Sequence, residues 1–361
     1  MSPKLKTLKD ANVKNKRVLM RVDFNATLDD EGKIIDDFRI QKGLPTIEYL
    51  IKKGAKIILM SHLGDPEGRI VEQLKMDVIQ DRLLEYLDYS IVKAKDCIGK
   101  EIEEWTNEMQ PGEILLLENL RFHKEEEDND LKFSKSLAKL GDIYVNEAFG
   151  VSHRKHASIT GVPKYLPAVA GFIFKREVEE LNKVLYSPGH PLIVIIGGAK
   201  VSTKIKVIEK FLDKADKLLL GGAIVNTVFA SQGINLGKSL IEEKMFNVVD
   251  RLDLAGGKIQ LPVDFVTWAE LDLEQAQVRG VNDVKENESV FDIGPETIKL
   301  FSKLIQEAKM IVWNGPLGLV EKEPFNKGSE AIAKAVTESR AYSIVGGGDM
   351  VAFIRHMGLE K

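Results

Sequence analysis

The chain has 361 residues, of which 44% are hydrophobic and 29% charged, and its formal net charge is −4. This length predicts two domains, and the composition is that of a globular protein without the basic field of a nucleic-acid-binding protein. A single cysteine, Cys97, excludes a disulfide framework and any site built from several thiolates. The lysine-rich N-terminus lacks the apolar segment of a secretory signal, and no apolar run reaches the ~18 residues of a membrane span. We therefore expect a soluble, cytoplasmic protein.

The first half of the chain alternates apolar runs with helical patterns. The predicted strands are residues 18–22, 57–60, 114–117 and 143–145, and the helical patterns cover residues 40–53, 78–89, 102–109 and 133–140. This alternation is typical of a parallel sheet covered by helices, in which ligands gather at the carboxyl ends of the strands. An α/β domain is therefore predicted, with its site at that edge.

Basic side chains follow these predicted strands. They lie in the segments RVDFN, DDFRI, SHLG, ENLRFH and NEAFGVSHRKH, and they are Arg21, Arg39, His62, Arg121, His123, His153, Arg154 and His156. One arginine alone is most simply a surface residue. Several at one sheet edge predict a pocket for a small, multiply anionic ligand, because a guanidinium binds carboxylate and phosphate through paired hydrogen bonds. The two histidines at 153 and 156 lack the companion residues of a zinc site.

A helical pattern over residues 171–186 ends in the segment Ser-Pro-Gly-His-Pro, directly before a new apolar run. Prolines and glycine at this point predict a domain boundary. We interpret the helix as a rigid connector, which gives the ranges 1–170, 171–187 and 188–361 for the first domain, the hinge helix and the second domain.

The second half opens on the apolar run 192–196, two glycines and an amphipathic helical pattern from residue 201. A strand that leads through glycines into a helix N-terminus presents backbone N–H groups to an anion. Lys200 and Lys204 lie on one face of the first turn, where the helix dipole disfavours cations. A polyphosphate would explain both lysines, and two solvated lysines are the simpler alternative.

Glycine-rich turns recur in the second half. Further buried strands are predicted at residues 218–222, 259–263, 310–313 and 343–345, and the turns WNGPLG, VGGGD and DIGP begin at residues 313, 345 and 292. We expect these turns at one edge of a parallel sheet, where backbone can approach a ligand closely. Asp349 is then a candidate Mg²⁺ carboxylate and Glu321 a candidate partner of ribose hydroxyls. GINLGKS only approximates a Walker A loop, and no GxGxxG motif occurs.

Jointly, these motifs resemble the phosphoglycerate kinase family. RVDFN, DDFRI, SHLG, ENLRFHKEEE, NEAFG, HRKHAS, GGAKVSTK, LPVD, DIGPET, WNGPLG and GGGD follow the order and approximate spacing of that family from about Val18 to Asp349. The resemblance implies two doubly wound parallel-sheet, Rossmann-like domains, the first binding phosphoglycerate and the second nucleotide. It implies reversible phosphoryl transfer from 1,3-bisphosphoglycerate to Mg-ADP, giving 3-phosphoglycerate and ATP, in a monomer without nucleic-acid or membrane partners.

The matching motif positions imply the residues of both sites. The phosphoglycerate set is Asp23, Phe24, Asn25, Arg39, His62, Leu63, Gly64, Asp65, Arg121 and Arg154. The nucleotide set is Gly198, Ala199, Lys200, Lys204, Gly222, Asn314, Glu321, Gly346, Gly347, Gly348, Asp349 and Met350, with Asp349 on the Mg²⁺. Arg39, Lys200 and Lys204 are the implied catalytic cations, because positioned positive charge supplies most of the catalysis of phosphoryl transfer.

The sequence departs from the family pattern at its C-terminal end and at several motif positions. It ends at Lys361, whereas the family continues with a glycine-rich turn and a tail, so we expect a truncated C-terminal end that impairs turnover more than binding. Asp65 stands where the family usually has arginine, and Met350 where it has a hydroxyl residue. These departures leave open an alternative, a catalytically impaired or non-catalytic relative that binds nucleotide or metabolite.

Overall fold

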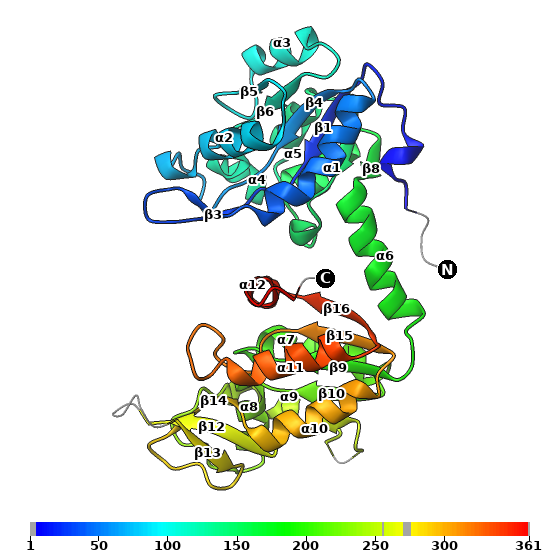
Figure 1. Cartoon of the computed structure of the whole chain (residues 1–361). Helices are drawn as coiled ribbons and strands as arrows, with labels where there is room; N and C mark the ends of the chain where they lie inside the picture. The colour runs from blue at the N-terminus through cyan, green and yellow to red at the C-terminus, as the bar shows by residue number, and fades with distance from the viewer. Residues whose placement is uncertain (1–4, 255, 270–275, 360–361) are drawn as a thin grey trace. The chain divides into compact units, whose positions relative to one another are not determined.

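A computed structural model of the chain describes residues 5–254, 256–269 and 276–359 (Figure 1). The chain divides into two compact units, Met1–Asn182 and Lys183–Lys361. The division falls inside helix α6 (Phe172–Tyr186), which covers most of the predicted connector. Every described helix falls short of the length or apolarity that a membrane crossing requires.

The first unit is built on a parallel sheet of six strands in the order β5-β6-β4-β1-β7-β8. The strands are β1 (Arg17–Arg21), β4 (Lys56–Met60), β5 (Ile91–Lys93), β6 (Ile114–Leu116), β7 (Ile143–Asn146) and β8 (Ala168–Ala170). Its α-helices are α1 (Phe38–Lys52), α2 (Asp77–Tyr86), α3 (Lys100–Glu108), α4 (Lys124–Glu127) and α5 (Leu131–Ala138), and β2 (Thr27–Leu28) pairs with β3 (Ile34–Asp36) in a hairpin. The four predicted strands of this half are therefore confirmed, and β5 and β8 extend the sheet at its two edges.

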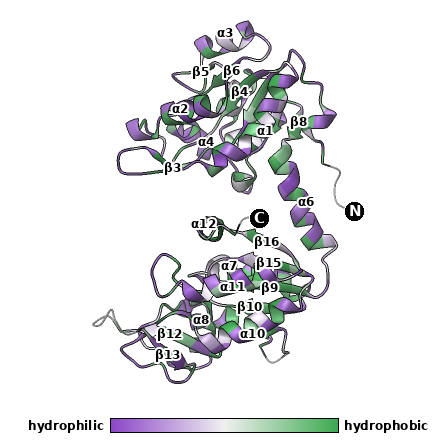
Figure 2. Cartoon of the chain, viewed as in Figure 1, coloured by the Kyte–Doolittle hydropathy of each residue, from purple (hydrophilic) through white to green (hydrophobic). Residues whose placement is uncertain are grey.

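The central strands are apolar on both faces because helices cover both. Val18 and Met20 of β1 belong to one buried cluster, while the intervening Leu19 belongs to another. Successive side chains of a strand point to opposite faces, so an uninterrupted apolar run supplies two cores at once. Figure 2 shows the same strands in hydrophobic green.

The second unit contains a parallel sheet in the order β11-β10-β9-β15-β16. Its strands are β9 (Leu192–Ile196), β10 (Lys217–Leu220), β11 (Ile259–Gln260), β15 (Met310–Asn314) and β16 (Tyr342–Gly346). The helices are α7 (Val201–Leu212), α8 (Ala223–Ser231), α9 (Phe246–Val249), α10 (Pro295–Gln306), α11 (Lys327–Glu338) and α12 (Gly348–His356). All five residues of β9 are buried, as predicted for a central strand.

One expectation for this unit is wrong. The turn DIGP does not lie on the parallel sheet, because the preceding strand β14 (Ser289–Ile293) pairs antiparallel with β12 (Asp264–Trp268). With β13 (Gln277–Gly280), these strands form a separate sheet in the order β13-β12-β14. The WNGPLG and VGGGD turns therefore follow strands of the parallel sheet, and the DIGP turn follows a strand of the antiparallel sheet.

Candidate active site

Three arginines and two histidines gather at the carboxyl edge of the first unit. Arg21 ends β1, His62 lies two residues beyond β4, Arg39 is in the first turn of α1, and Arg121 lies in a short 3-10 helix after β6. Burial and the charges of Arg21, Arg121, Arg39 and His156 together hold the pKa of His62 far below its usual value. The edge thus carries permanent guanidinium charges around a neutral imidazole, which suits a small polyanion.

Asp23 orients Arg39. The Nη1 atom of Arg39 lies 3.0 and 3.1 Å from the two carboxylate oxygens of Asp23. The Arg39 side chain is 47% exposed while that of Asp23 is 14% exposed, so the carboxylate holds a guanidinium that is still open to solvent. Arg39 is therefore positioned without being buried.

The loop after β4 is held by its backbone. Gly64 donates its N–H to Asn25 Oδ1 at 2.8 Å and accepts from Arg121 Nη1 at 2.8 Å, and its φ of +63° favours glycine. The side chains of Phe24 and Leu63 are fully buried in the core, which leaves only their backbone available to a ligand.

Two predicted residues lie at the rim of this edge. Asp65 is 72% exposed and its Oδ1 lies 3.7 Å from Arg121 Nη1. Arg154 is exposed, and its charge acts on the neighbouring His156. Both side chains are screened by solvent, so their effect on a bound anion is weaker than that of the buried Arg121.

Asn119 is part of this loop structure and was missed by sequence reasoning. Its Oδ1 accepts from the backbone N–H groups of Leu63 and Arg121, and its Nδ2 donates to the carbonyl of Leu63. The amide thereby fixes the loop after β4 to the 3-10 helix after β6. The motif ENLRFH contained the residue, but only the fold shows what it contacts.

The second unit contains a cavity of about 470 Å³ between its two sheets' glycine turns. Five residues of the predicted nucleotide set line it, namely Gly198, Ala199, Gly222, Glu321 and Asp349. Its apolar lining comes from Val225, Leu240, Phe265, Val290, Phe291, Ile293, Leu317 and Leu319. An apolar cavity of this size with a few polar groups is typical of a site for a flat, drug-sized ligand such as a nucleoside.

Lys204 is the inner lysine of the α7 turn. Its Nζ donates to Asn314 Oδ1. Asn314 also lies beside Gly346 and Gly347, because its Nδ2 would be 3.5 Å from a Cβ atom added to either glycine. Partial burial lowers the pKa of Lys204, and the charge of Asp349 opposes that effect. Lys204, Asn314, the two glycines and Asp349 therefore form one cluster at the parallel edge.

Three other residues of the predicted nucleotide set do not line the cavity. Lys200 is the exposed N-cap residue of α7 and is not among the residues that line the cavity. Gly348 begins α12 with open space beside it. The side chain of Met350 is fully buried in the core, so only its backbone can serve a ligand.

Sequence and structure comparisons identify the family. The family profile described as phosphoglycerate kinase matches residues 8–361. The chain belongs to the phosphoglycerate kinase family. A phosphoglycerate kinase from Moorella thermoacetica is 48% identical over 98% of this chain and 91% of its own length. One from Finegoldia magna is also 48% identical, with the same two coverages.

Solved structures of phosphoglycerate kinases agree. The structure from Coxiella burnetii is 38% identical, with a TM-score of 0.86 over 99% of this chain and 91% of that one. The structure from Pyrococcus horikoshii is 34% identical, with a TM-score of 0.85 over 98% and 91%. The chain is therefore a kinase with two doubly wound α/β domains, and the alternative of a non-catalytic relative is not favoured.

Asp292 is a further residue of the phosphoglycerate kinase cavity that sequence reasoning did not assign. It is buried, lines the cavity, and accepts backbone hydrogen bonds from Gly328 at 2.6 Å and Ile293 at 2.8 Å. Burial raises its pKa to about 7, although both hydrogen bonds oppose the shift. The carboxyl group thus ties the DIGP turn to the N-terminus of α11.

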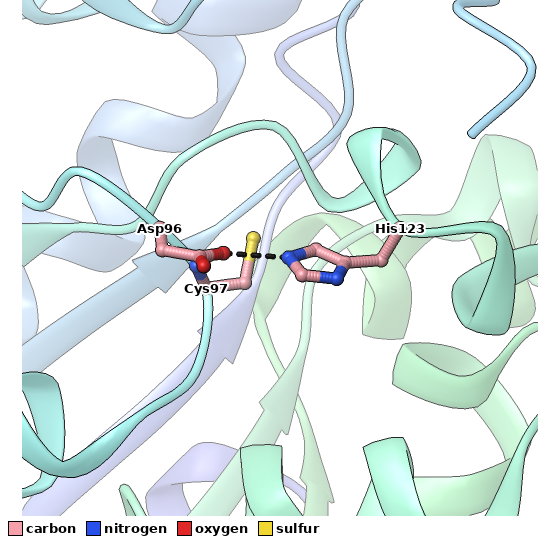
Figure 3. Close-up of side chains that lie close together, drawn as sticks. All are labelled: Asp96, Cys97 and His123. Atoms are coloured by element: carbon pink, nitrogen blue, oxygen red, sulfur yellow. Dashed lines mark hydrogen bonds and ion pairs between the residues drawn. The ribbon is translucent and has the colours of Figure 1, made fainter. Parts of the chain in front are cut away.

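Figure 3 shows Asp96, Cys97 and His123, whose ligand atoms lie within 4.8 Å of one another. His123 Nε2 is 2.5 Å from Asp96 Oδ1, and Cys97 Sγ donates to the carbonyl of Glu118 at 2.9 Å. Burial raises the pKa of Cys97 well above its usual value and keeps it a thiol. Because each group already has a protein partner, we interpret the cluster as a contact between two loops and not as a metal site.

The His123–Asp96 pair predicts a pH window for stability. The hydrogen bond that His123 donates to the Asp96 carboxylate raises the pKa of His123. Burial works to raise the pKa of Asp96, but the hydrogen bonds from His123 and the Cys97 N–H lower it overall. The stabilisation is therefore lost as pH rises through the raised pKa of His123 and as pH falls through the lowered pKa of Asp96.

We expect His123→Gln to lower the free energy of unfolding by about 1 kcal/mol at pH 5.5 and by much less at pH 9. Urea unfolding at both pH values measures the difference. The exposed His153, replaced in the same way, is the control and should cost little at either pH. An equal loss at both pH values for His123→Gln would contradict the assignment.

Proposed function

We propose that this kinase transfers a phosphoryl group reversibly between 1,3-bisphosphoglycerate and Mg-ADP, with phosphoglycerate bound in the first unit and nucleotide in the second. The observation that carries the assignment of the first unit is the gathering of the Arg39 and Arg121 guanidiniums around His62, whose ring is contacted by the buried Arg21. A phosphate and a carboxylate on one small molecule match several permanent cations better than any neutral metabolite does.

In the first unit, Arg39 is the proposed contact of the transferring group. Asp23 fixes one nitrogen of its guanidinium, and the side chain is half exposed. Phosphoryl transfer spreads negative charge over the equatorial oxygens of the transferring group, so a positioned cation lowers the barrier. Arg121 and Arg154 are proposed to hold the distal anionic group, with Asn25 and Gly64 shaping the loop beneath it.

In the second unit, the apolar cavity is proposed to hold the nucleobase, and Glu321 the ribose hydroxyls. Lys204 and Lys200 would bind phosphate oxygens, and the α7 N-terminus adds backbone N–H groups. Asp349 fits a Mg²⁺ site because the residue lines the cavity and its charge acts on Lys204. Bound Mg²⁺ would neutralise phosphate charge there.

The deciding experiment is a coupled assay for ATP formation from 1,3-bisphosphoglycerate and ADP. We expect Mg²⁺-dependent turnover in the range of typical kinases, on the order of 1–100 s⁻¹ or more. Tight ADP binding without any turnover would overturn the proposal. The further expectations remain predictions: the cytoplasmic location rests on the composition, the domain ranges rest on the segment Ser-Pro-Gly-His-Pro, and the monomeric state and the hinge role of α6 rest on the family resemblance.

Lys204→Met should raise the KM for ADP about tenfold or more. The lysine charge is only partly compensated by Asp349, and a polyphosphate would supply the missing negative charge. Losing one charge-assisted hydrogen bond costs about 1.5–3 kcal/mol, which corresponds to roughly 10- to 150-fold. Steady-state kinetics measure the change. The matched control is Lys206→Met, because Lys206 is exposed on the same helix, and a similar effect from both variants would refute the role.

A further inference from the structure

Arg21 is buried beside the substrate site instead of lining it. Its side chain ends β1 and the residue is only 1% exposed. Nε donates to Ser158 Oγ at 2.8 Å, Nη1 donates to the carbonyl of Val22, and Nη2 lies 3.2 Å from His62 Nδ1. Each guanidinium nitrogen therefore has a protein partner, whereas an arginine that binds a ligand directly needs nitrogen atoms directed at that ligand.

The other end of this contact is anchored by a buried carboxylate. Glu126 is fully buried and accepts from Ser158 N at 2.8 Å and from Ser158 Oγ at 2.5 Å. Ser158 Oγ thus donates to Glu126 and accepts from Arg21. The chain Glu126–Ser158–Arg21–His62 is a continuous buried network, and such a network fixes the orientation of its members.

The contact determines which ring nitrogen of His62 carries the proton. A guanidinium has donors and no acceptor, so His62 Nδ1 must accept and its proton must be on Nε2. Among the described residues, none forms a hydrogen bond with His62 Nε2. This atom is also not one of the fully buried side-chain atoms that are left without a partner, so it is not sealed off from solvent. The Nε2–H group is therefore open to the site.

Burial and the charges around His62 keep its ring neutral. Arg21 faces it from β1, Arg39 from α1, Arg121 from the 3-10 helix after β6, and His156 from the residue before Ala157–Gly161. None of these groups is an anion, and the ring is buried. Protonation of Nδ1 would add a cation among cations and would break the contact with Arg21.

We propose that Arg21 is a positioning residue that holds His62 as the neutral Nε2–H tautomer, so that His62 is an uncharged hydrogen-bond donor to an oxygen of bound phosphoglycerate. The opposite tautomer would direct a nitrogen lone pair at that oxygen and repel it. The inference rests on the proposed substrate of this unit, but the state of the ring can be tested without it.

The direct test is ¹⁵N NMR of the wild-type chain labelled at its six histidines. His62→Gln assigns the signal by its loss. We expect an acceptor-type Nδ1 shift and a donor-type Nε2 shift that stay unchanged between pH 5.5 and 8.5. A proton on Nδ1, or a titration near the usual histidine pKa, would overturn the proposal whether or not the chain turns over.

A pair of variants separates the hydrogen bond from the charge. Arg21→Gln and Arg21→Met both remove the cation, but only glutamine can donate to His62 Nδ1. We expect Arg21→Met to raise the KM for phosphoglycerate about tenfold with a smaller change in kcat, and Arg21→Gln to recover most of that KM. Equal KM values for the two variants, with the KM for nucleotide unchanged in both as evidence of folding, would refute the positioning role. Absence of turnover in the wild type would instead refute the proposed function.

Discussion

Arg39→Ala should lower kcat by about 10²–10³ while the chain stays folded. Its guanidinium is held by both oxygens of Asp23 and is 47% exposed, so truncation removes a prepositioned cation and leaves no buried void. The stabilisation lost is specific to the transition state, because charge on the transferring group is most dispersed there. Steady-state or stopped-flow kinetics in the direction of ATP formation measure the change in kcat.

The matched control for this prediction is Arg17→Ala. Arg17 also pairs with an aspartate, at 2.8 Å from Asp142 Oδ1, but it begins β1 and so lies at the opposite edge of the sheet. We expect a small loss of stability and kcat within about twofold of wild type. A kcat for Arg39→Ala within a few-fold of wild type, or an equal loss for Arg17→Ala, would refute the catalytic assignment of Arg39.

Gly197→Ala should destabilise the second unit by about 3 kcal/mol or more. A Cβ at this position would lie 1.9 Å from the carbonyl oxygen of Pro316 and 2.8 Å from that of Gly315. Both neighbours are backbone atoms of the WNGPLG turn, so relief requires the two glycine turns to separate. Urea unfolding measures the effect, and the KM for ADP should rise with it because Gly198 and Pro316 line the cavity.

Gly189→Ala provides the control within the same unit. Its added Cβ would meet Lys309 Cβ at 3.6 Å, an ordinary van der Waals contact. We expect a change within about 0.5 kcal/mol. If Gly197→Ala unfolded at the same urea concentration as Gly189→Ala, the close packing of the two turns would be wrong.

The amino-acid sequence predicted the parallel sheets well because their central strands are buried on both faces. An uninterrupted apolar run such as Leu192–Ile196 supplies side chains to the hydrophobic cores on both faces of the sheet. A short run of this kind is therefore typical of a strand in the middle of a parallel sheet. The antiparallel sheet was misjudged because β12 and β14 are mixed in polarity, although each is as long as β9. Their pairing, with Phe265 opposite Ile293, joins residues far apart in the chain, and no local period encodes it.

The sequence by itself determined which chemical groups this protein brings to its two edges: arginines after the strands of the first half, and glycine turns with lysines in the second. It could do so because motifs are local. Only the tertiary structure decided what each group can do there, since that depends on contacts across long sequence separations. Arg21 and His62 are 41 residues apart, yet the buried Arg21 contacts the His62 ring directly. Burial of that ring, together with the charges around it, makes His62 a neutral group. Burial likewise removed the Met350 side chain from the site, because hydrogen bonding and desolvation act through space and not along the chain.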